Sequence, residues 1–157
     1  MPIDDLSITV VAPEHIDDIA RVGPIDREEV RARIERGDTC YGAWRRGELA
    51  HFSWVQTRGK HEIGPAGITV PIGSSSFWIY NCRTHDAHRG AGIYTRTLAR
   101  IASDAFAGGM KTGWIYTTAS NVASQRGILK AGFVQRDTLR ALHIGRRYLN
   151  FDAFTKP

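Results

Sequence analysis

The apolar positions of the chain change their spacing between residues 77 and 106. Residues 77–82 combine aromatic and β-branched side chains, which is typical of a strand. A short glycine-rich stretch at 89–92 interrupts this pattern. Four apolar residues then recur at the spacing of one helical face: Leu98, Ile101, Ala102 and Ala105. The pattern predicts a strand, a turn and a helix in direct succession.

Periodic segments also flank this central stretch. A second strand is predicted at residues 112–118, followed by a helix that opens at Asn121 and ends near residue 133. Two closing strands are predicted at 133–142 and 148–154. Near the N-terminus, residues 8–11 form a predicted strand and Pro13 opens a short helix.

A longer helix is predicted to begin at Asp26. Asp26 and Glu29 occupy the N-cap and N3 positions of a capping box, and Gly37 ends the helix. Val30 and Ile34 are predicted to share its apolar face, with the charged residues mostly outside.

An antiparallel strand pair is predicted at 40–44 and 49–55. Residues 57–73 contain four glycines and two prolines, so they are predicted to be too broken for one regular element, although 68–70 can extend a strand. Trp78 and Tyr80 are predicted to be core residues.

Length and composition favour one globular domain over residues 1–157. The chain has 157 residues, of which 42% are hydrophobic and 24% charged. No apolar run is long enough to span a bilayer, and the N-terminal sequence lacks the pattern of a signal peptide, so we expect a cytoplasmic protein. The two cysteines, Cys40 and Cys82, are expected to be buried thiols.

The net charge of +5 suits either a nucleic acid or a phosphorylated cofactor. The basic residues are scattered and do not alternate with aromatic ones, so the sequence favours nucleic acid only weakly.

The glycine-rich stretch at 89–92 predicts an anion site, because the free amides and the dipole of a helix N-terminus attract negative charge. A dinucleotide fingerprint would need a third glycine near Thr95, and a Walker loop would need Lys-Ser or Lys-Thr where Ile93 and Tyr94 stand. The sequence therefore fits neither motif.

Two motifs resemble those of the GNAT family of acyl-CoA-dependent N-acyltransferases. The first is the turn at Arg89, Gly90 and Gly92, which resembles the family's Q/R-x-x-G-x-G/A motif. The second is N-x-x-A-x-x-x-Y-x-x-x-G-F, whose spacing is kept in one set of residues: Asn121, Ser124, Ile128, Gly132 and Phe133. The resemblance covers most of the chain. It implies an α/β fold, a single GNAT-like domain with a central mixed, largely antiparallel twisted sheet flanked by about four helices.

The resemblance also implies a function and a cofactor site. The expected activity is N-acetyl transfer from acetyl-CoA (coenzyme A) to a primary amine by direct attack, without a metal. Coenzyme A would be bound by the turn and the first helical residues: Arg89, Gly90, Ala91, Gly92, Ile93 and Tyr94. The main chain of Cys82 and Thr84 would bond the pantetheine arm and the acyl carbonyl. Asn121 would bond the same arm or serve only as a helix N-cap.

The catalytic residues implied by the resemblance are incomplete, because Ile128 stands where many family members have a tyrosine acid. Ser124, one helical turn earlier, is either the replacement acid or a small packing residue. No Asp or Glu occurs from 63 to 85, so the base is expected to be a bound water or His85, with His61 and Glu62 as weaker candidates. The alternative for His85 is a loop histidine that only contacts phosphate or solvent. His85 and His88 lack an obvious third metal ligand.

The amine acceptor is not readable from the sequence, since small metabolites, antibiotics and peptide or protein amines all fit. Three other functions stay open: a degenerate module that senses acyl-CoA without turnover, a basic nucleic-acid-binding domain, and a regulatory or toxin partner protein. Assembly as a homodimer also stays open.

Overall fold

A computed structural model describes residues 5–144 and 147–150. The strands are β1 (Leu6–Val10), β2 (Thr39–Arg45), β3 (Glu48–Gln56), β4 (Lys60–Ile63), β5 (Ile68–Pro71), β6 (Ser76–Thr84), β7 (Thr112–Ile115), β8 (Ala141–Ile144) and β9 (Arg147–Asn150). The helices are α1 (Ile16–Val22), α2 (Arg27–Arg36), α3 (Ile93–Ala107) and α4 (Val122–Lys130). Three short 3₁₀ turns accompany them: η1 (Pro13–His15), η2 (Gly64–Ala66) and η3 (Asp86–His88).

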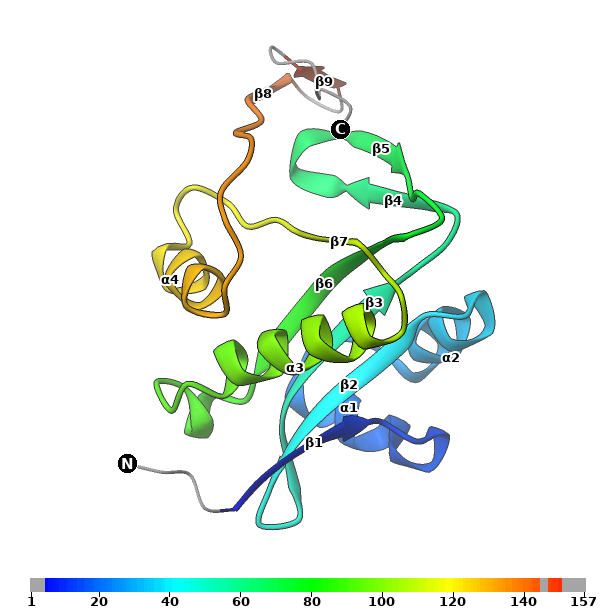
Figure 1. The fold of residues 1–157 in the computed structure, drawn as a ribbon, viewed down its shortest axis with the longest axis vertical. Coiled ribbons are helices and arrows are strands. Elements are labelled where there is room, and N and C mark those ends of the chain that lie inside the picture. The colour runs from blue at the N-terminus through cyan, green and yellow to red at the C-terminus, as the bar shows by residue number, and fades with distance from the viewer. Residues whose placement is uncertain (1–4, 145–146, 151–157) are drawn as a thin grey trace.

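The main sheet has the strand order β1-β2-β3-β6-β7 (Figure 1). Its first four strands pair antiparallel, and β6 pairs with β7 in parallel. Two small antiparallel pairs, β4–β5 and β8–β9, stand apart from it. The predicted α/β class and mixed, largely antiparallel sheet are therefore confirmed.

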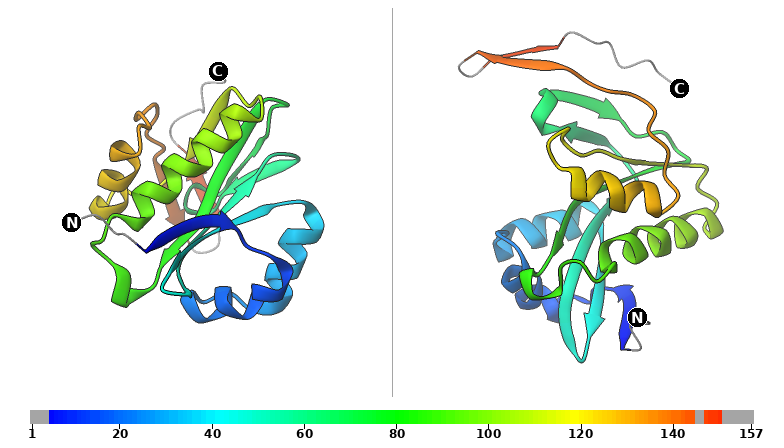
Figure 2. Two further views of the ribbon diagram at one scale, coloured as in Figure 1. Left: turned by 60° about the horizontal axis from the view of Figure 1, so that its bottom comes forward. Right: turned by 90° about the vertical axis from the view of Figure 1, so that its left-hand side faces the viewer.

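Helices cover both faces of this sheet. Figure 2 shows α3 on one face and α1 and α2 on the other, with α4 beside α3. The alternation of side chains along β6 follows this division. Phe77 and Ile79 pack with Leu98 and Ile101 of α3, whereas Tyr80 joins the cluster of buried residues beneath α1 and α2.

The helix α2 begins as predicted but buries a different face. Asp26 Oδ1 accepts the Glu29 amide at 2.8 Å, and Gly37 ends the helix at a φ of 91°. The Glu29 side chain does not return to the cap. It binds Arg33 instead. The expectation that Ile34 shares the buried face with Val30 is wrong, because Ile34 is 37% exposed while Arg33 is buried.

Three predicted segments also differ from the observed strands. Within residues 57–73, β4 and β5 form an antiparallel hairpin, since their residues pair from Lys60 opposite Pro71 to Ile63 opposite Ile68. Residues 134–140 carry no strand, and the first closing strand begins only at Ala141. The strand expected at 112–118 ends early, at Ile115. The last part of the second closing strand, 151–154, lies outside the described residues.

Candidate active site

The predicted anion-binding turn leads from the end of β6 into α3. Gly90 and Gly92 have φ values of 77° and 72°, a conformation that favours glycine. Gly92 is the N-cap of α3 and offers no side chain to the first helical amides. A Cβ atom built on either glycine meets nothing within 4 Å. The amides at the start of this helix are thus open to a ligand, as the first amides of a helix lack intrahelical acceptors.

Arg89 and His85 have partners within the turn, whereas the buried Nδ1 atom of His88 has none among the described residues. Arg89 Nη2 lies 2.7 Å from Asp86 Oδ1, and both side chains are exposed. The His85 Nδ1 atom accepts the Ala87 amide at 3.3 Å. Among the described residues, His85 and His88 are not joined by other His, Cys, Asp or Glu side chains in a group suited to a metal.

His85 also borders a polar cleft of about 320 Å³. The cleft lies between the α1–α2 connection and the end of β6, and it is lined by Arg21, Val22, Gly23, Pro24, Arg83, His85 and Asp86. The candidate base from the sequence therefore faces a space that a polar molecule can enter.

An open edge runs along the second half of β6. Its pairing with β7 ends at Ile79 opposite Ile115, whereas β6 continues to Thr84. The His85 amide donates to Ala50 of β3 at 2.9 Å. Since backbone groups alternate between the two sides of a strand, the main chain of Thr84 and Cys82 faces the side that β7 has left.

A β-bulge lies in this open stretch. Phe52 pairs with Arg83 and Trp54 with Tyr80, so one residue of β3 stands opposite two of β6. Asn81, one of those two, has a φ of 44°. In the amide orientation that satisfies hydrogen bonding, its side-chain oxygen accepts from Arg33 at 2.8 Å.

The hydroxyl groups of Tyr94 and Ser124 meet between α3 and α4, 3.1 Å apart. The Tyr94 ring packs so closely on α4 that a Cβ atom at Gly127 would lie 2.6 Å from it. Burial raises the pKa of the Tyr94 phenol, which keeps it protonated. Ser124 thus has a proton-carrying partner, which the motif does not predict. Asn121 Oδ1 accepts the Ser124 amide at 3.1 Å and so acts as a helix cap.

His51 is a buried residue that the sequence analysis missed. Its Nδ1 atom lies 2.7 Å from Thr84 Oγ1, and its Nε2 atom lies 2.8 Å from Ser53 Oγ. Burial lowers the pKa of His51 to about 3, so the ring is neutral at physiological pH. It holds the end of β6 next to the open edge. No local pattern marks it, because its partners come from two strands.

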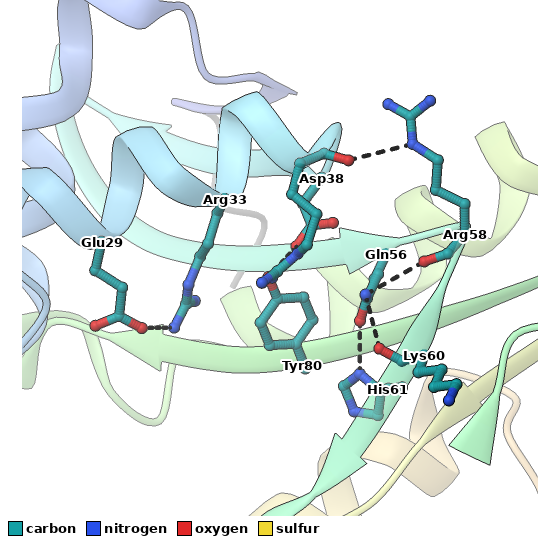
Figure 3. A network of polar contacts seen from close by, with 9 residues as sticks. Glu29, Arg33, Asp38, Gln56, Arg58, Lys60, His61 and Tyr80 are labelled. Atoms are coloured by element: carbon teal, nitrogen blue, oxygen red, sulfur yellow. Dashed lines mark hydrogen bonds and ion pairs between the residues drawn. The ribbon is translucent and has the colours of Figure 1, made fainter. Parts of the chain in front are cut away.

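A second polar network lies on the other face of the sheet (Figure 3). Asp38 is buried, and its Oδ2 atom accepts from Tyr80 Oη at 2.5 Å and from Arg36 Nη2 at 2.5 Å. Burial, followed by the hydrogen bond to Asp38, raises the pKa of the Tyr80 phenol. The Arg33 guanidinium lies 5.2 Å from the centre of the Trp54 ring and 5.0 Å from that of Tyr80.

The two cysteines are free thiols, and burial raises the pKa of Cys82 to about 12. No helix in the described part of the chain combines the length and apolar character needed to cross a membrane.

Comparisons by sequence and by structure give different results. No family model matches the sequence, and no curated protein matches it either. Several solved structures match the fold. An aminoglycoside N-acetyltransferase in complex with CoA is 15% identical, with a TM-score of 0.65, over 90% of this chain and 99% of that one.

Two further structures extend this likeness. An aminoglycoside acetyltransferase from an uncultured soil metagenomic sample, in complex with sisomicin, is 8% identical over 92% of this chain and 98% of its own, with a TM-score of 0.68. A ribosomal-protein-alanine N-acetyltransferase from Brucella melitensis is 12% identical over 89% and 99%, with a TM-score of 0.65. At this identity the likeness shows the fold, which is that of the GNAT acetyltransferases, as the sequence motifs predicted.

Proposed function

We propose that this protein, which has the GNAT acetyltransferase fold, is an N-acyltransferase that moves an acetyl group from acetyl-CoA to a primary amine. One observation carries the proposal. The open edge of β6 runs directly into a turn whose amides have no capping side chain. A ligand with an anionic end and an extended amide-containing arm matches these two neighbouring features.

The residues present fit coenzyme A. The turn amides from Gly90 to Tyr94 suit its pyrophosphate, because no side chain obstructs Gly90 or Gly92. The outward main chain of Cys82 and Thr84 suits the amides of the pantetheine arm. When bound, acetyl-CoA supplies an acyl group as a thioester, which is activated towards attack by an amine.

Ser124 and Tyr94 are the proposed source of the proton for the departing thiol. Ser124 lies at the N-terminal end of α4 and is half-buried, and its hydroxyl contacts that of Tyr94 at 3.1 Å. Because burial raises the pKa of Tyr94, the phenol stays protonated and can replace a proton given up by Ser124. This pair takes over a role that Ile128 cannot fill.

The acceptor is proposed to be a small-molecule or peptide amine. Structures with this fold include an aminoglycoside acetyltransferase and a ribosomal-protein-alanine N-acetyltransferase, so the fold accommodates both classes. The fold alone does not choose between them.

A second candidate function is a sensor that binds acyl-CoA without turnover. It is favoured by Ile128, because that position lacks a hydroxyl group. Both functions predict binding of acetyl-CoA, and only the first predicts cleavage of the thioester.

Two measurements test the proposal. Thermal unfolding with acetyl-CoA at about a hundred times its dissociation constant is expected to show about 2.7 kcal/mol of added stability. Thiol release is then followed with sisomicin, spermidine and an alanine-initiated peptide as acceptors. Binding without thiol release from any of these amines supports the sensor, and an unchanged unfolding midpoint at millimolar acetyl-CoA contradicts both functions.

A further inference from the structure

His61 lies over the point where β6 and β7 part. Its ring stacks on Trp78 at a centroid distance of 4.6 Å and meets the Tyr80 ring edge-on at 5.4 Å. Tyr116, the residue after β7, lies 6.1 Å away. Trp78 belongs to the paired part of β6, and Tyr80 is the first residue beyond it. The imidazole therefore spans the start of the open edge, on the face opposite α3.

Hydrogen bonds fix the tautomer of this ring (Figure 3). The Gln56 amide nitrogen donates to the carbonyls of Arg58 and Lys60, at 3.3 Å and 3.1 Å. These two bonds orient the amide, so Gln56 Oε1 faces His61 Nδ1 at 2.9 Å. A carbonyl oxygen only accepts, so the proton lies on Nδ1 and the Nε2 atom keeps its lone pair.

The Nε2 atom of His61 is buried and finds no hydrogen-bond partner among the described residues. Buried polar atoms nearly always have a partner, so an unpaired one calls for a functional explanation. His51 differs from His61, because each of its ring nitrogens has a hydroxyl group as a hydrogen-bond partner.

The surroundings keep the His61 ring uncharged. Burial lowers the pKa of His61 to about 4, and the charge of Arg36 acts in the same direction, against the opposing charge of Asp38. The phenols of Tyr80 and Tyr116 also face the ring, and burial raises the pKa of each, so both are neutral. The lone pair is therefore available at every pH above about 4.

We propose that His61 is the general base of the acyl transfer, taking a proton from the acceptor amine through Nε2. This inference rests on the proposed function. The amine nitrogen bonds to the thioester carbonyl carbon, the carbon–sulfur bond breaks, and the amine proton passes to His61 Nε2. The departing thiolate takes a proton from the pair formed by Ser124 and Tyr94. His61 then returns its proton to solvent, and the Ser124–Tyr94 pair regains a proton from solvent.

The acceptor reaches the ring from the side of Tyr116. Of the three aromatic neighbours, Trp78 is 4% exposed and Tyr116 is 37% exposed, so Tyr116 marks the solvent side. Catalytic contacts are often incomplete before the substrate binds, and the assignment requires a movement that uncovers Nε2.

The first test does not depend on activity. Ring ¹⁵N–¹H NMR of the full chain follows its six histidines, and the spectrum of His61→Gln identifies the His61 signals. We expect the Nδ1–H tautomer and a titration midpoint near 4. A proton on Nε2 at neutral pH removes the lone pair that the base needs and overturns the assignment.

The second test uses acetyl-CoA with whichever of sisomicin, spermidine and the alanine-initiated peptide is turned over fastest. His61→Gln is expected to lower kcat about 100-fold, while acetyl-CoA affinity and the unfolding midpoint stay near wild type. In His61→Ala, added imidazole is expected to raise kcat at least about tenfold.

Variants at His85 and Gln56 separate the competing explanations. If His85→Gln lowers kcat about 100-fold and His61→Gln stays within twofold of wild type, the base is His85 and only this assignment falls. Gln56→Leu removes the acceptor of the His61 Nδ1–H. If Gln56 positions the ring, this variant is expected to show a shifted His61 tautomer by NMR. Gln56→Glu keeps an acceptor oxygen and is expected to correct part of that shift. If wild type binds acetyl-CoA but acylates none of the amines, the proposed function falls and this assignment falls with it.

Discussion

The two faces of the sheet differ in which polar groups they bury and in how those groups are paired. On the α3 face, the candidate site is made of main-chain groups around Gly92 and the open edge of β6, and the buried His51 has both nitrogens paired. On the opposite face, the site is made of side chains, and Asp38, Trp54 and His61 each keep a buried atom without a partner in the described structure.

This difference predicts opposite sensitivities. A main-chain site depends on backbone conformation and tolerates most side-chain changes. A side-chain network depends on every member, because removal of one partner leaves another buried polar group unsatisfied.

Lowering the pH tests both faces together, since each contains a buried neutral imidazole ring. The pKa of His61 is lowered to about 4 and that of His51 to about 3, from an ordinary 6.5. The folded state then binds fewer protons than the unfolded state below pH 6.5, so stability is unaffected above 6.5 and falls as the pH drops towards 3. At 1.36 kcal/mol per pH unit, the expected loss is about 3 kcal/mol for His61 and about 5 for His51.

Urea unfolding at pH 7, 5 and 4 measures this loss. His61→Gln is expected to make the decline shallower, because one of the two groups no longer titrates. Equal stability at pH 7 and pH 4 in the wild type would contradict the prediction.

Gly92→Val tests the main-chain site directly. Gly92 has a φ of 72°, which a β-branched residue adopts only with strain. A cost of about 3 kcal/mol at the turn corresponds to coenzyme A binding roughly 100-fold weaker, measured by calorimetry. Gly109→Val is the matched control, since Gly109 has a φ of 91° and equally open surroundings at the far end of α3. Normal affinity in a folded Gly92→Val variant would exclude the turn as the binding site.

Ser124→Ala tests whether the α3 face also contributes a side chain to the chemistry. As a proton donor Ser124 acts mainly in the transition state, so kcat is expected to fall roughly 10- to 100-fold with acetyl-CoA affinity nearly unchanged. Tyr94→Phe removes the partner hydroxyl, and its kcat is expected to fall by a similar factor. Ser103→Ala, at an exposed position of α3, is the control. A kcat within about twofold of wild type would leave Ser124 as a packing residue.

The smallest effect is expected for Arg89→Ala. The variant removes one charged contact and leaves the amides, and Arg89 is already held by Asp86 at 2.7 Å. Coenzyme A binding is expected to weaken by about 1.5 kcal/mol, the low end of the range for a charged hydrogen bond. Asp86→Asn frees the guanidinium and is expected to tighten binding. A larger loss for Arg89→Ala than for Gly92→Val would reverse the view that the backbone dominates this face.

The sequence predicts the elements that are determined by residues close together in the chain. The turn from β6 into α3 and the Asp26 cap of α2 are set by residues a few positions apart, and both are present. The hairpin at 60–71 is harder to predict, because glycines and prolines interrupt a short pairing of four residues per strand. Ile34 follows the helical spacing, yet the aromatic rings of other strands select Arg33 for burial.

The side-chain site escapes prediction for the same physical reason. Asp38, Tyr80 and His61 come from three segments, and only tertiary packing brings them together. The sequence names His61 as a weak candidate because nothing local fixes its position, and its fixation by Gln56 depends on the start of β4 turning back against β3.

The bulge at Asn81 has a consequence for solubility. An unpaired stretch of strand inside a sheet is a template for addition of a foreign strand, which leads to aggregation. The φ of 44° at Asn81 breaks the regular spacing of the amides and carbonyls along this edge. A uniformly pleated peptide cannot match that spacing, whereas a flexible ligand arm can. The irregular residue thus leaves the edge open to small molecules while discouraging other polypeptide chains.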